Sequence, residues 1–227
     1  FISKYISIIT ISRGEQYFLS SVLEKPIGYI PFGIDKDFWS PSDTTSSEAN
    51  YVLSIGNDLA RDWETLIASW KSSYPLLKII TSLPVENDRK NIEVIKGDWR
   101  TSLISDEGVR SLYRNSMFVV IPLKETIQPA GQSSCLQAMA CGKAVIISNV
   151  SGLWDRDIMV EGENVLLPEP GNIKQLSLAI KELLENKSLR MSLSNKARIT
   201  IEEKLNTKEM ALALSNYLYK ENDCIVY

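Results

Sequence analysis

The sequence predicts an α/β fold in which a largely parallel β-sheet is covered by helices on both faces. Short apolar runs alternate along the chain with longer amphipathic stretches, which is the pattern of successive strand–helix units. Apolar residues make up 44% of the 227 residues, enough to form a buried core. We therefore expect one large α/β domain, with at most a fragment of another.

The first part of the chain favours a strand–helix pair followed by a connecting stretch. Residues 5–11 favour a strand, residues 13–23 a helix, and residues 28–31 a short extended piece. Residues 40–48 are polar and rich in turn-forming residues, which is typical of an exposed loop or linker. This segment is the best candidate for a domain boundary.

Beyond the boundary the strand–helix units become regular. Strands are expected where apolar residues are contiguous, at 51–55, 76–81, 92–95, 117–121, 144–147 and 164–167. Helices are expected between and after them, including one at 131–140, because apolar residues recur every three to four positions. The apolar helix positions are Trp63, Ile67 and Trp70; Val109, Leu112 and Tyr113; Leu176, Ile180, Leu183 and Leu184; and Met210, Leu214 and Leu218.

Composition excludes several classes of function. The net charge of −3 argues against a general nucleic-acid or anionic-membrane surface as the partner. No apolar run approaches the ~20 residues that span a bilayer. The absence of histidine excludes a Ser-His-Asp triad and His-based zinc sites, so a general base would be Asp, Glu, Lys or Tyr, or would come from another polypeptide. Cys135, Cys141 and Cys224 have no metal-ligand spacing and form no disulfide framework, which fits a reducing, cytoplasmic compartment.

The most informative motif is a buried strand followed by a loop and by a helix that begins near Gly131. Parallel sheets bind ligands at the carboxyl ends of their strands, which is where this loop lies. The helix begins with small residues, so the backbone N–H groups of Gln132, Ser133 and Ser134 are open to an anion at the positive end of the helix dipole. Gln137 lies one turn beyond Ser133 on the same face. The motif predicts a phosphate site with Gln137 beside the rest of the ligand.

This motif and its neighbours resemble those of a known family. Residues 125–147, above all the segment AMACGKAVI at 138–146, resemble the donor-site signature of retaining GT-B glycosyltransferases of family 4. Other motifs follow in the family's order. Residues 29–35 resemble its interdomain linker, and residues 54–57 and 61–63 resemble the first strand and the phosphate loop of its C-terminal domain. Residues 95–99 resemble the strand and turn near the base of the donor, and residues 155–167 resemble the stretch after the signature helix.

The resemblance implies a Rossmann-like nucleotide-sugar-binding domain at residues 40–205. Residues 1–39 would be the last strand–helix unit of an N-terminal domain together with the interdomain linker. Residues 206–227 would be a helix that crosses back to that domain, with a tail. Because the N-terminal, acceptor-binding domain would be missing or a separate chain, we expect this chain to be inactive by itself.

The implied reaction transfers a hexose from a nucleoside-diphosphate sugar to an acceptor such as a glycan or a lipid-linked saccharide, with retention at the anomeric carbon. Such enzymes serve polysaccharide biosynthesis. The resemblance implies neither a cofactor nor a metal, and it places any peripheral membrane contact in the missing half. Asp155 and Asp157 imitate an Asp-x-Asp metal motif, but an acidic loop suffices to explain them.

The family's residues map onto this chain with several departures. Its two signature glutamates correspond to Pro129, which cannot bind the donor sugar, and to Gln137, which offers the ribose an uncharged amide. Glu125 is the carboxylate expected to reach in from the loop and to act in catalysis. Asn57 replaces the phosphate-binding Arg, and Arg61 is the nearest cation. The expected donor-binding residues are Gly56, Asn57, Arg61, Gly97, Trp99, Gly131, Gln132, Ser133, Ser134 and Gln137.

Two other functions remain open. Pro129 and Gln137 favour a non-catalytic nucleotide-sugar-binding or scaffold subunit. A sugar-nucleotide 2-epimerase shares the architecture, but the absence of histidine and the linker motif argue against it. The donor base, the sugar and the acceptor are open as well.

Overall fold

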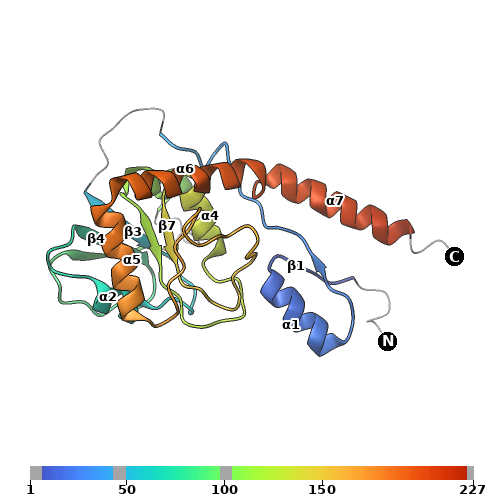
Figure 1. The fold of residues 1–227 in the computed structure, drawn as a ribbon, viewed down its shortest axis with the longest axis horizontal. Helices are drawn as coiled ribbons and strands as arrows, with labels where there is room; N and C mark the ends of the chain where they lie inside the picture. The colour runs from blue at the N-terminus through green and yellow to red at the C-terminus, as the bar shows by residue number, and fades with distance from the viewer. Residues whose placement is uncertain (1–6, 43–49, 98–103, 224–227) are drawn as a thin grey trace.

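The computed structural model describes residues 7–42, 50–97 and 104–223 of the chain. Its main element is a parallel five-stranded sheet with the strand order β5-β4-β3-β6-β7, which confirms the predicted α/β fold (Figure 1). The strands are β3 (Tyr51–Ile55), β4 (Leu76–Thr81), β5 (Ile92–Lys96), β6 (Val119–Ile121) and β7 (Val145–Ile147). The chain adds strands outward from β3 to β5, and then returns to the other side of β3 for β6 and β7.

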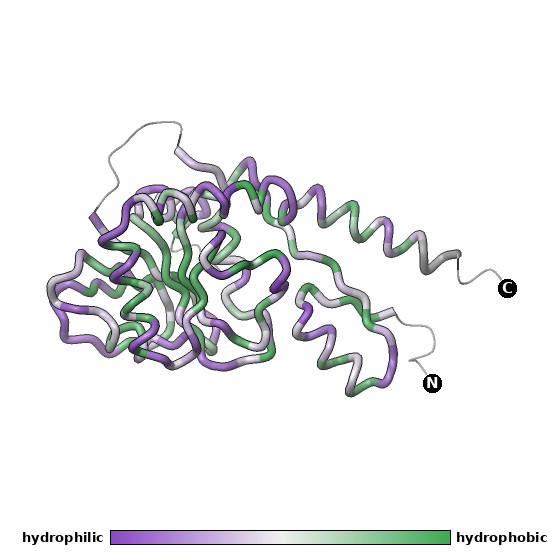
Figure 2. The backbone as a smooth tube through the Cα atoms, viewed as in Figure 1, coloured by the Kyte–Doolittle hydropathy of each residue, from purple (hydrophilic) through white to green (hydrophobic). Residues whose placement is uncertain are grey.

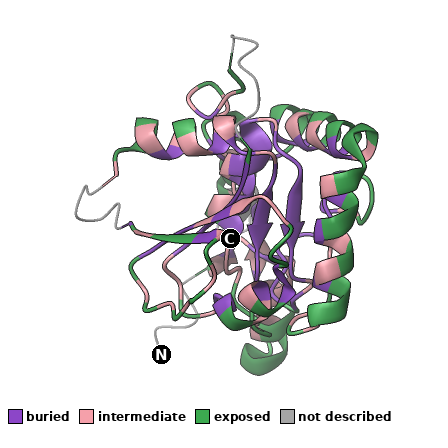
Figure 3. Cartoon of the chain, turned by 90° about the vertical axis from the view of Figure 1, so that its left-hand side faces the viewer, coloured by how far each residue is buried: buried purple, intermediate pink, exposed green. Residues whose placement is uncertain are grey.

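The core lies on both faces of this sheet. Every residue of β3 is buried, as expected for a central strand covered on both sides. Successive side chains of a strand point to opposite faces, so Val52 and Leu53 belong to two different clusters of buried residues. Figure 2 shows the strands as the most hydrophobic part of the chain, and Figure 3 shows them enclosed by helices whose outer faces are exposed.

Helices α2 (Trp63–Ser69) and α5 (Ile173–Glu185) cover one face, and α3 (Asp106–Asn115) and α4 (Gln132–Ala140) cover the other. Helix α6 (Lys187–Glu203) packs against both α4 and α5 and closes the end of the sheet between the two clusters. It places Leu193 in one cluster and Ala197 in the other.

The way these helices begin separates α4 from its neighbours. Helices α2, α3, α5 and α6 each start at an Asp, Ser or Asn whose side chain accepts a hydrogen bond from a backbone N–H of the first turn. Helix α4 starts at Gly131, which has no side-chain acceptor. The N–H groups at the start of α4 therefore need acceptors from elsewhere.

The N-terminal elements form a separate small unit. Strands β1 (Ile9–Thr10) and β2 (Gly28–Tyr29) pair in parallel around α1 (Arg13–Leu23), which has no buried residue. Helix α7 (Thr207–Asp223) projects from the body on the same side (Figure 1). Across residues 7–42, 50–97 and 104–223, no helix is long and apolar enough to cross a membrane.

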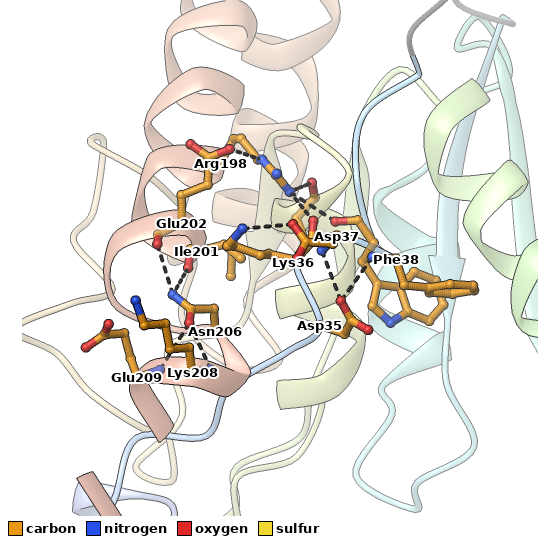
Figure 4. A network of polar contacts seen from close by, with 12 residues as sticks. Asp35, Lys36, Asp37, Phe38, Arg198, Ile201, Glu202, Asn206, Lys208 and Glu209 are labelled. Atoms are coloured by element: carbon orange, nitrogen blue, oxygen red, sulfur yellow. Dashed lines mark hydrogen bonds and ion pairs between the residues drawn. The ribbon is translucent and has the colours of Figure 1, made fainter. Parts of the chain in front are cut away.

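Two segments connect this small unit and α7 to the main domain. They are the linker after β2, whose residues 35–38 lie beside Arg198 of α6 in Figure 4, and the turn between α6 and α7 that contains Asn206. The N–H of Ile34 donates to the carbonyl of Leu205 at 3.0 Å, and the N–H of Thr207 donates to the carbonyl of Ile34 at 3.1 Å. A Cβ atom on Gly33 would overlap the carbonyl oxygen of Asn206, so only glycine allows this approach. The side chain of Arg198 donates to the carbonyls of Lys36, Trp39 and Ala140 at 3.0, 3.0 and 2.7 Å.

The predicted strand at 164–167 is wrong, because the structure has only isolated bridges there, between Ile146 and Leu166 and between Glu161 and Val165. The Asn164 side chain binds the backbone at Val160 and Ile158, which holds this end of the segment in a turn. Pro168 follows and has no N–H to continue the ladder. The other predicted strands and helices are present with small shifts at their ends, and only Ile9–Thr10 of the 5–11 strand is described as strand.

Candidate functional site

The site begins at the carboxyl edge of the sheet, between the central strands β3 and β6. The chain moves outward in one direction from β3 and in the other from β6, so this is the point where the strand order reverses. Open α/β sheets bind ligands in the crevice at such a point. Here the loop after β3 begins with Gly56, and the loop after β6 leads into α4.

The start of α4 supplies backbone donors at this edge. Gly131 adopts φ +72°, a left-handed conformation that favours glycine. The N–H of Gln132 reaches the carbonyl of Pro129 at 3.4 Å, and the N–H of Cys135 begins the regular helical bonding to Gly131. The N–H groups of Ser133 and Ser134 lie between these two and have no acceptor within the described residues. The helix start can therefore bind an anion.

Arg61 lies directly behind these donors. Its side chain is buried, and its Nη2 donates to Ser134 Oγ at 3.1 Å while Nε lies 3.2 Å from Asp58 Oδ2. Its Nη1 is buried without a partner in the described part of the chain. Burial lowers the pKa of Arg61, and the charge of Asp58 opposes that shift. A buried guanidinium nitrogen without an acceptor is costly, so this position favours an anionic ligand.

A cavity of about 450 Å³ connects these groups. Its lining joins the loops after β3 and β6 to Ile11 and Phe32 from the N-terminal unit. The expected donor-binding residues that line it are Gly56, Asn57, Arg61, Gly131, Gln132, Ser133 and Ser134.

A larger groove of about 850 Å³ lies between α2 and residues 83–89. Its lining mixes cations such as Arg89 and Lys124 with the carboxylates of Glu64, Glu86 and Asp88. We assign the site to the smaller cavity because the open N–H groups of α4 and the side chain of Arg61 meet there.

Asn57 holds the sheet edge together. Its Nδ2 donates to the carbonyl of Gly97 at 3.1 Å, and its Oδ1 accepts from Thr81 Oγ1 at 3.1 Å and from the N–H of Ser82 at 2.6 Å. These bonds connect the ends of β3, β4 and β5. Asn57 lines the cavity, but its amide oxygen is committed to the protein. Gly97 takes part through its carbonyl, and Trp99 lies outside the described residues.

Gln137 lies in an adjoining small cavity of about 90 Å³, which shares Ser133 and Ser134 with the cavity of about 450 Å³. Its Oε1 accepts a hydrogen bond from the hydroxyl of Tyr113 at 3.3 Å. Burial raises the pKa of Tyr113, which is therefore a neutral phenol. From the sequence, Tyr113 was expected only as a core residue of α3. A buried tyrosine nevertheless needs a hydrogen-bond partner for its hydroxyl. That requirement is the feature of the sequence that could have indicated a polar role for Tyr113.

Glu125 lies apart from these residues. It is exposed, its Oε1 accepts from the N–H of Ser151 at 2.9 Å, and it does not line either cavity. Pro129, which replaces the first signature glutamate of the family that the sequence resembles, lines the cavity of about 450 Å³.

Asp155 connects the main domain to the N-terminal unit. Its Oδ2 accepts from the hydroxyl of Tyr29 at 3.0 Å and lies 3.6 Å from Nε of Arg13, while Oδ1 accepts from the N–H of Asp157 at 2.9 Å. Burial and the charge of Asp155 raise the pKa of Tyr29. These contacts give the carboxylate a structural role. In the described part of the chain, no three His, Cys, Asp or Glu side chains are grouped to hold a metal ion.

Residues 101–200 match the family described as Glycosyl transferases group 1. An uncharacterized glycosyltransferase of Methanocaldococcus jannaschii is 32% identical over 123 residues, which are 54% of this chain and 32% of the relative. A second uncharacterized glycosyltransferase of the same organism is 34% identical over 77 residues, or 34% of this chain and 19% of the relative. The chain thus spans about a third or less of the length of these relatives.

Solved structures with low sequence identity share the fold. A glycosyltransferase from Rickettsia africae has a TM-score of 0.77 at 14% identity, covering 99% of this chain and 65% of that chain. An Anabaena protein in complex with UDP and glucose has a TM-score of 0.74 at 15% identity, covering 95% and 64%. The C-terminal domain of a glycosyl transferase group 1 family protein from Francisella tularensis has a TM-score of 0.61 at 18% identity, covering 77% of this chain and 100% of that domain.

Proposed function

Because the chain contains a domain of the glycosyl transferases group 1 family, with the α/β fold of a GT-B C-terminal domain, we propose that it is the donor-binding half of a retaining hexosyltransferase. The donor would be a nucleoside-diphosphate sugar, and the acceptor a glycan or a lipid-linked saccharide. The Anabaena protein of similar fold, solved with UDP and glucose, supports a donor of this chemistry.

The observation that carries the proposal is the meeting of Arg61 with the start of α4. A diphosphate in the cavity would accept from the N–H groups of Ser133 and Ser134 and from the unpartnered Nη1 of Arg61. Sugar transfer leaves negative charge on the departing diphosphate, and fixed donors stabilise that charge as it develops. These residues would therefore serve both binding and catalysis, without a metal.

The acceptor would bind on a further domain that faces this one. The greater length of the relatives is consistent with such a domain. Helices α1 and α7, which project from the body in Figure 1, support it because they expose apolar side chains. These are Tyr17, Phe18, Val22 and Leu23 of α1, and Leu212, Leu214 and Leu218 of α7. A surface of this kind favours contact with another protein surface.

A nucleotide-sugar-binding subunit without turnover is the second candidate. Pro129 lines the cavity where the family has a sugar-binding glutamate, and Glu125 bonds to Ser151 outside it. The two candidate functions differ in turnover but share the donor site. For either function, we expect no sugar transfer by the 227-residue chain alone.

Calorimetry of the chain with UDP and with GDP tests the donor site. We expect weak binding of at least one, and no heat from either at millimolar concentration would remove the proposal. Arg61→Gln should weaken binding about tenfold, since a hydrogen bond to a charged group contributes roughly 1.5–3 kcal/mol. Arg61→Lys, which keeps the charge, should lose less affinity for the nucleotide than Arg61→Gln. Lys124→Gln is the control, because this exposed cation lies beside the site without lining the cavity.

A further inference from the structure

The small cavity beside the anion site has a different chemistry from its neighbour. Besides Ser133 and Ser134, it is lined by the apolar residues Trp39, Ile55 and Val109 and by the polar residues Asp106, Tyr113 and Gln137. Its volume is about 90 Å³. A nucleotide with its diphosphate at Ser133 and Ser134 would place its ribose there.

The amide of Gln137 is oriented by Tyr113. The hydroxyl of Tyr113 donates to Gln137 Oε1 at 3.3 Å. One of the two acceptor sites of the amide oxygen is therefore used within the protein, and Nε2 is the donor that the amide offers to a ligand.

This arrangement leaves Gln137 at most one acceptor site for a ribose. The hydrogens of two vicinal hydroxyl groups need two acceptors, and the amide nitrogen only donates, so a second acceptor must come from another residue. Asp106 is the one carboxylate among the described residues that line the cavity. It is the first residue of α3, it is exposed, and no described residue forms a hydrogen bond or ion pair with its side chain.

We propose that Asp106 binds the ribose hydroxyls of the donor nucleotide and selects ribonucleotides over deoxyribonucleotides. This assignment rests on the proposed donor-binding function. The two carboxylate oxygens accept from the 2′- and 3′-hydroxyls, and Gln137 Nε2 donates to a ribose oxygen. Ile55 and Val109 contact the carbon face of the sugar. The acceptor thus comes from α3 rather than from α4.

The test compares UDP and GDP with their 2′-deoxy forms by calorimetry on the 227-residue chain. Asp106→Asn should weaken the ribonucleotide about fivefold, because a charged acceptor becomes a neutral one, and should change the deoxynucleotide much less. Glu107→Gln is the matched control. It removes the same charge from the same helical turn, but this residue does not line the cavity.

Equal losses for ribo- and deoxynucleotide in Asp106→Asn would overturn the assignment, because they would mean an effect of charge or folding. Unchanged affinity for both would overturn it too and leave the donor-binding function intact. If the chain without any substitution binds neither UDP nor GDP, both the proposed function and this assignment are wrong. The melting temperature of each variant checks that α3 is still formed.

Discussion

The guanidinium of Arg61 packs against the backbone of Gly131 so closely that a Cβ atom on residue 131 would stand 2.8 Å from Nη1. On its other side the group packs against Gly56, where an added Cβ would overlap Nε. Arg61 therefore occupies a space that two glycines from different loops leave open. The cation and the N–H groups of α4 are held in one fixed arrangement.

Gly131→Ala should disturb both stability and nucleotide binding. An alanine at φ +72° is strained by roughly 1–2 kcal/mol, and its Cβ would also displace the side chains of Ile121 and Arg61. Gly162→Ala is the control, because Gly162 has the same φ of +72° with nothing within 4 Å of an added Cβ. Urea unfolding should show a larger loss of stability for Gly131→Ala than for Gly162→Ala. Only Gly131→Ala should lose affinity for UDP or GDP. Equal losses of stability would mean that the close contacts with Ile121 and Arg61 contribute little.

Arg198→Met should lower the free energy of unfolding by about 2–3 kcal/mol. The substitution leaves the carbonyls of Lys36, Trp39 and Ala140 without their charged donor. Glu202→Gln removes only the half-exposed ion pair with Arg198 and should cost about 0–1 kcal/mol. If the two variants unfold at the same urea concentration, the three carbonyl bonds do not stabilise the chain as we expect.

Stability should fall as the pH rises from about 9 to 12. Burial raises the pKa of the Cys141 thiol from 9.0 to about 12 and also raises that of Cys135. The folded chain therefore disfavours the thiolate. The stabilisation is complete below the unfolded pKa and is lost as the pH rises toward the folded one. Each such group adds a slope of about 1.4 kcal/mol per pH unit within that range. In unfolding experiments under reducing conditions, Cys141→Ala should reduce the slope, and an identical slope would contradict the assignment.

Chelation should leave nucleotide binding unchanged. The donor site offers backbone N–H groups and Arg61 to the diphosphate, and Asp155 is engaged by Tyr29 and Arg13. Calorimetry with UDP or GDP in the presence of EDTA measures this directly. A tenfold loss of affinity would return Asp155 and Asp157 to consideration as metal ligands.

The sequence predicted the fold better than it predicted the site. Strands such as β3 are apolar on both faces, so their pattern is local and can be recognised without knowing their neighbours. The segment 164–167 has the same apolar character, but side-chain bonds from Asn164 and the proline that follows decide its conformation.

The site depends on contacts between distant segments. Arg61 was expected as a cation near the phosphates, but its fixed position requires Gly56 and Gly131 to lie side by side. Asn57 was expected in the donor site because it replaces the phosphate-binding Arg of the family that the sequence resembles. Three partners from two other strand ends determine its bonds. The direction of the Gln137 amide follows from Tyr113 on another helix. None of these relationships is encoded in a local spacing.

The bonded pair of segments at Ile34 and Asn206 is one anchor between the main domain and the elements that project from it. The linker after β2 and the turn between α6 and α7 are tied at the same point, so neither can bend independently. The bonds of Tyr29 and Arg13 to Asp155 hold the N-terminal unit to the main domain at a second place. A further domain that rests on α1 would therefore be anchored to this chain at two separate places, one on each side of Phe32 and the cavity that it lines.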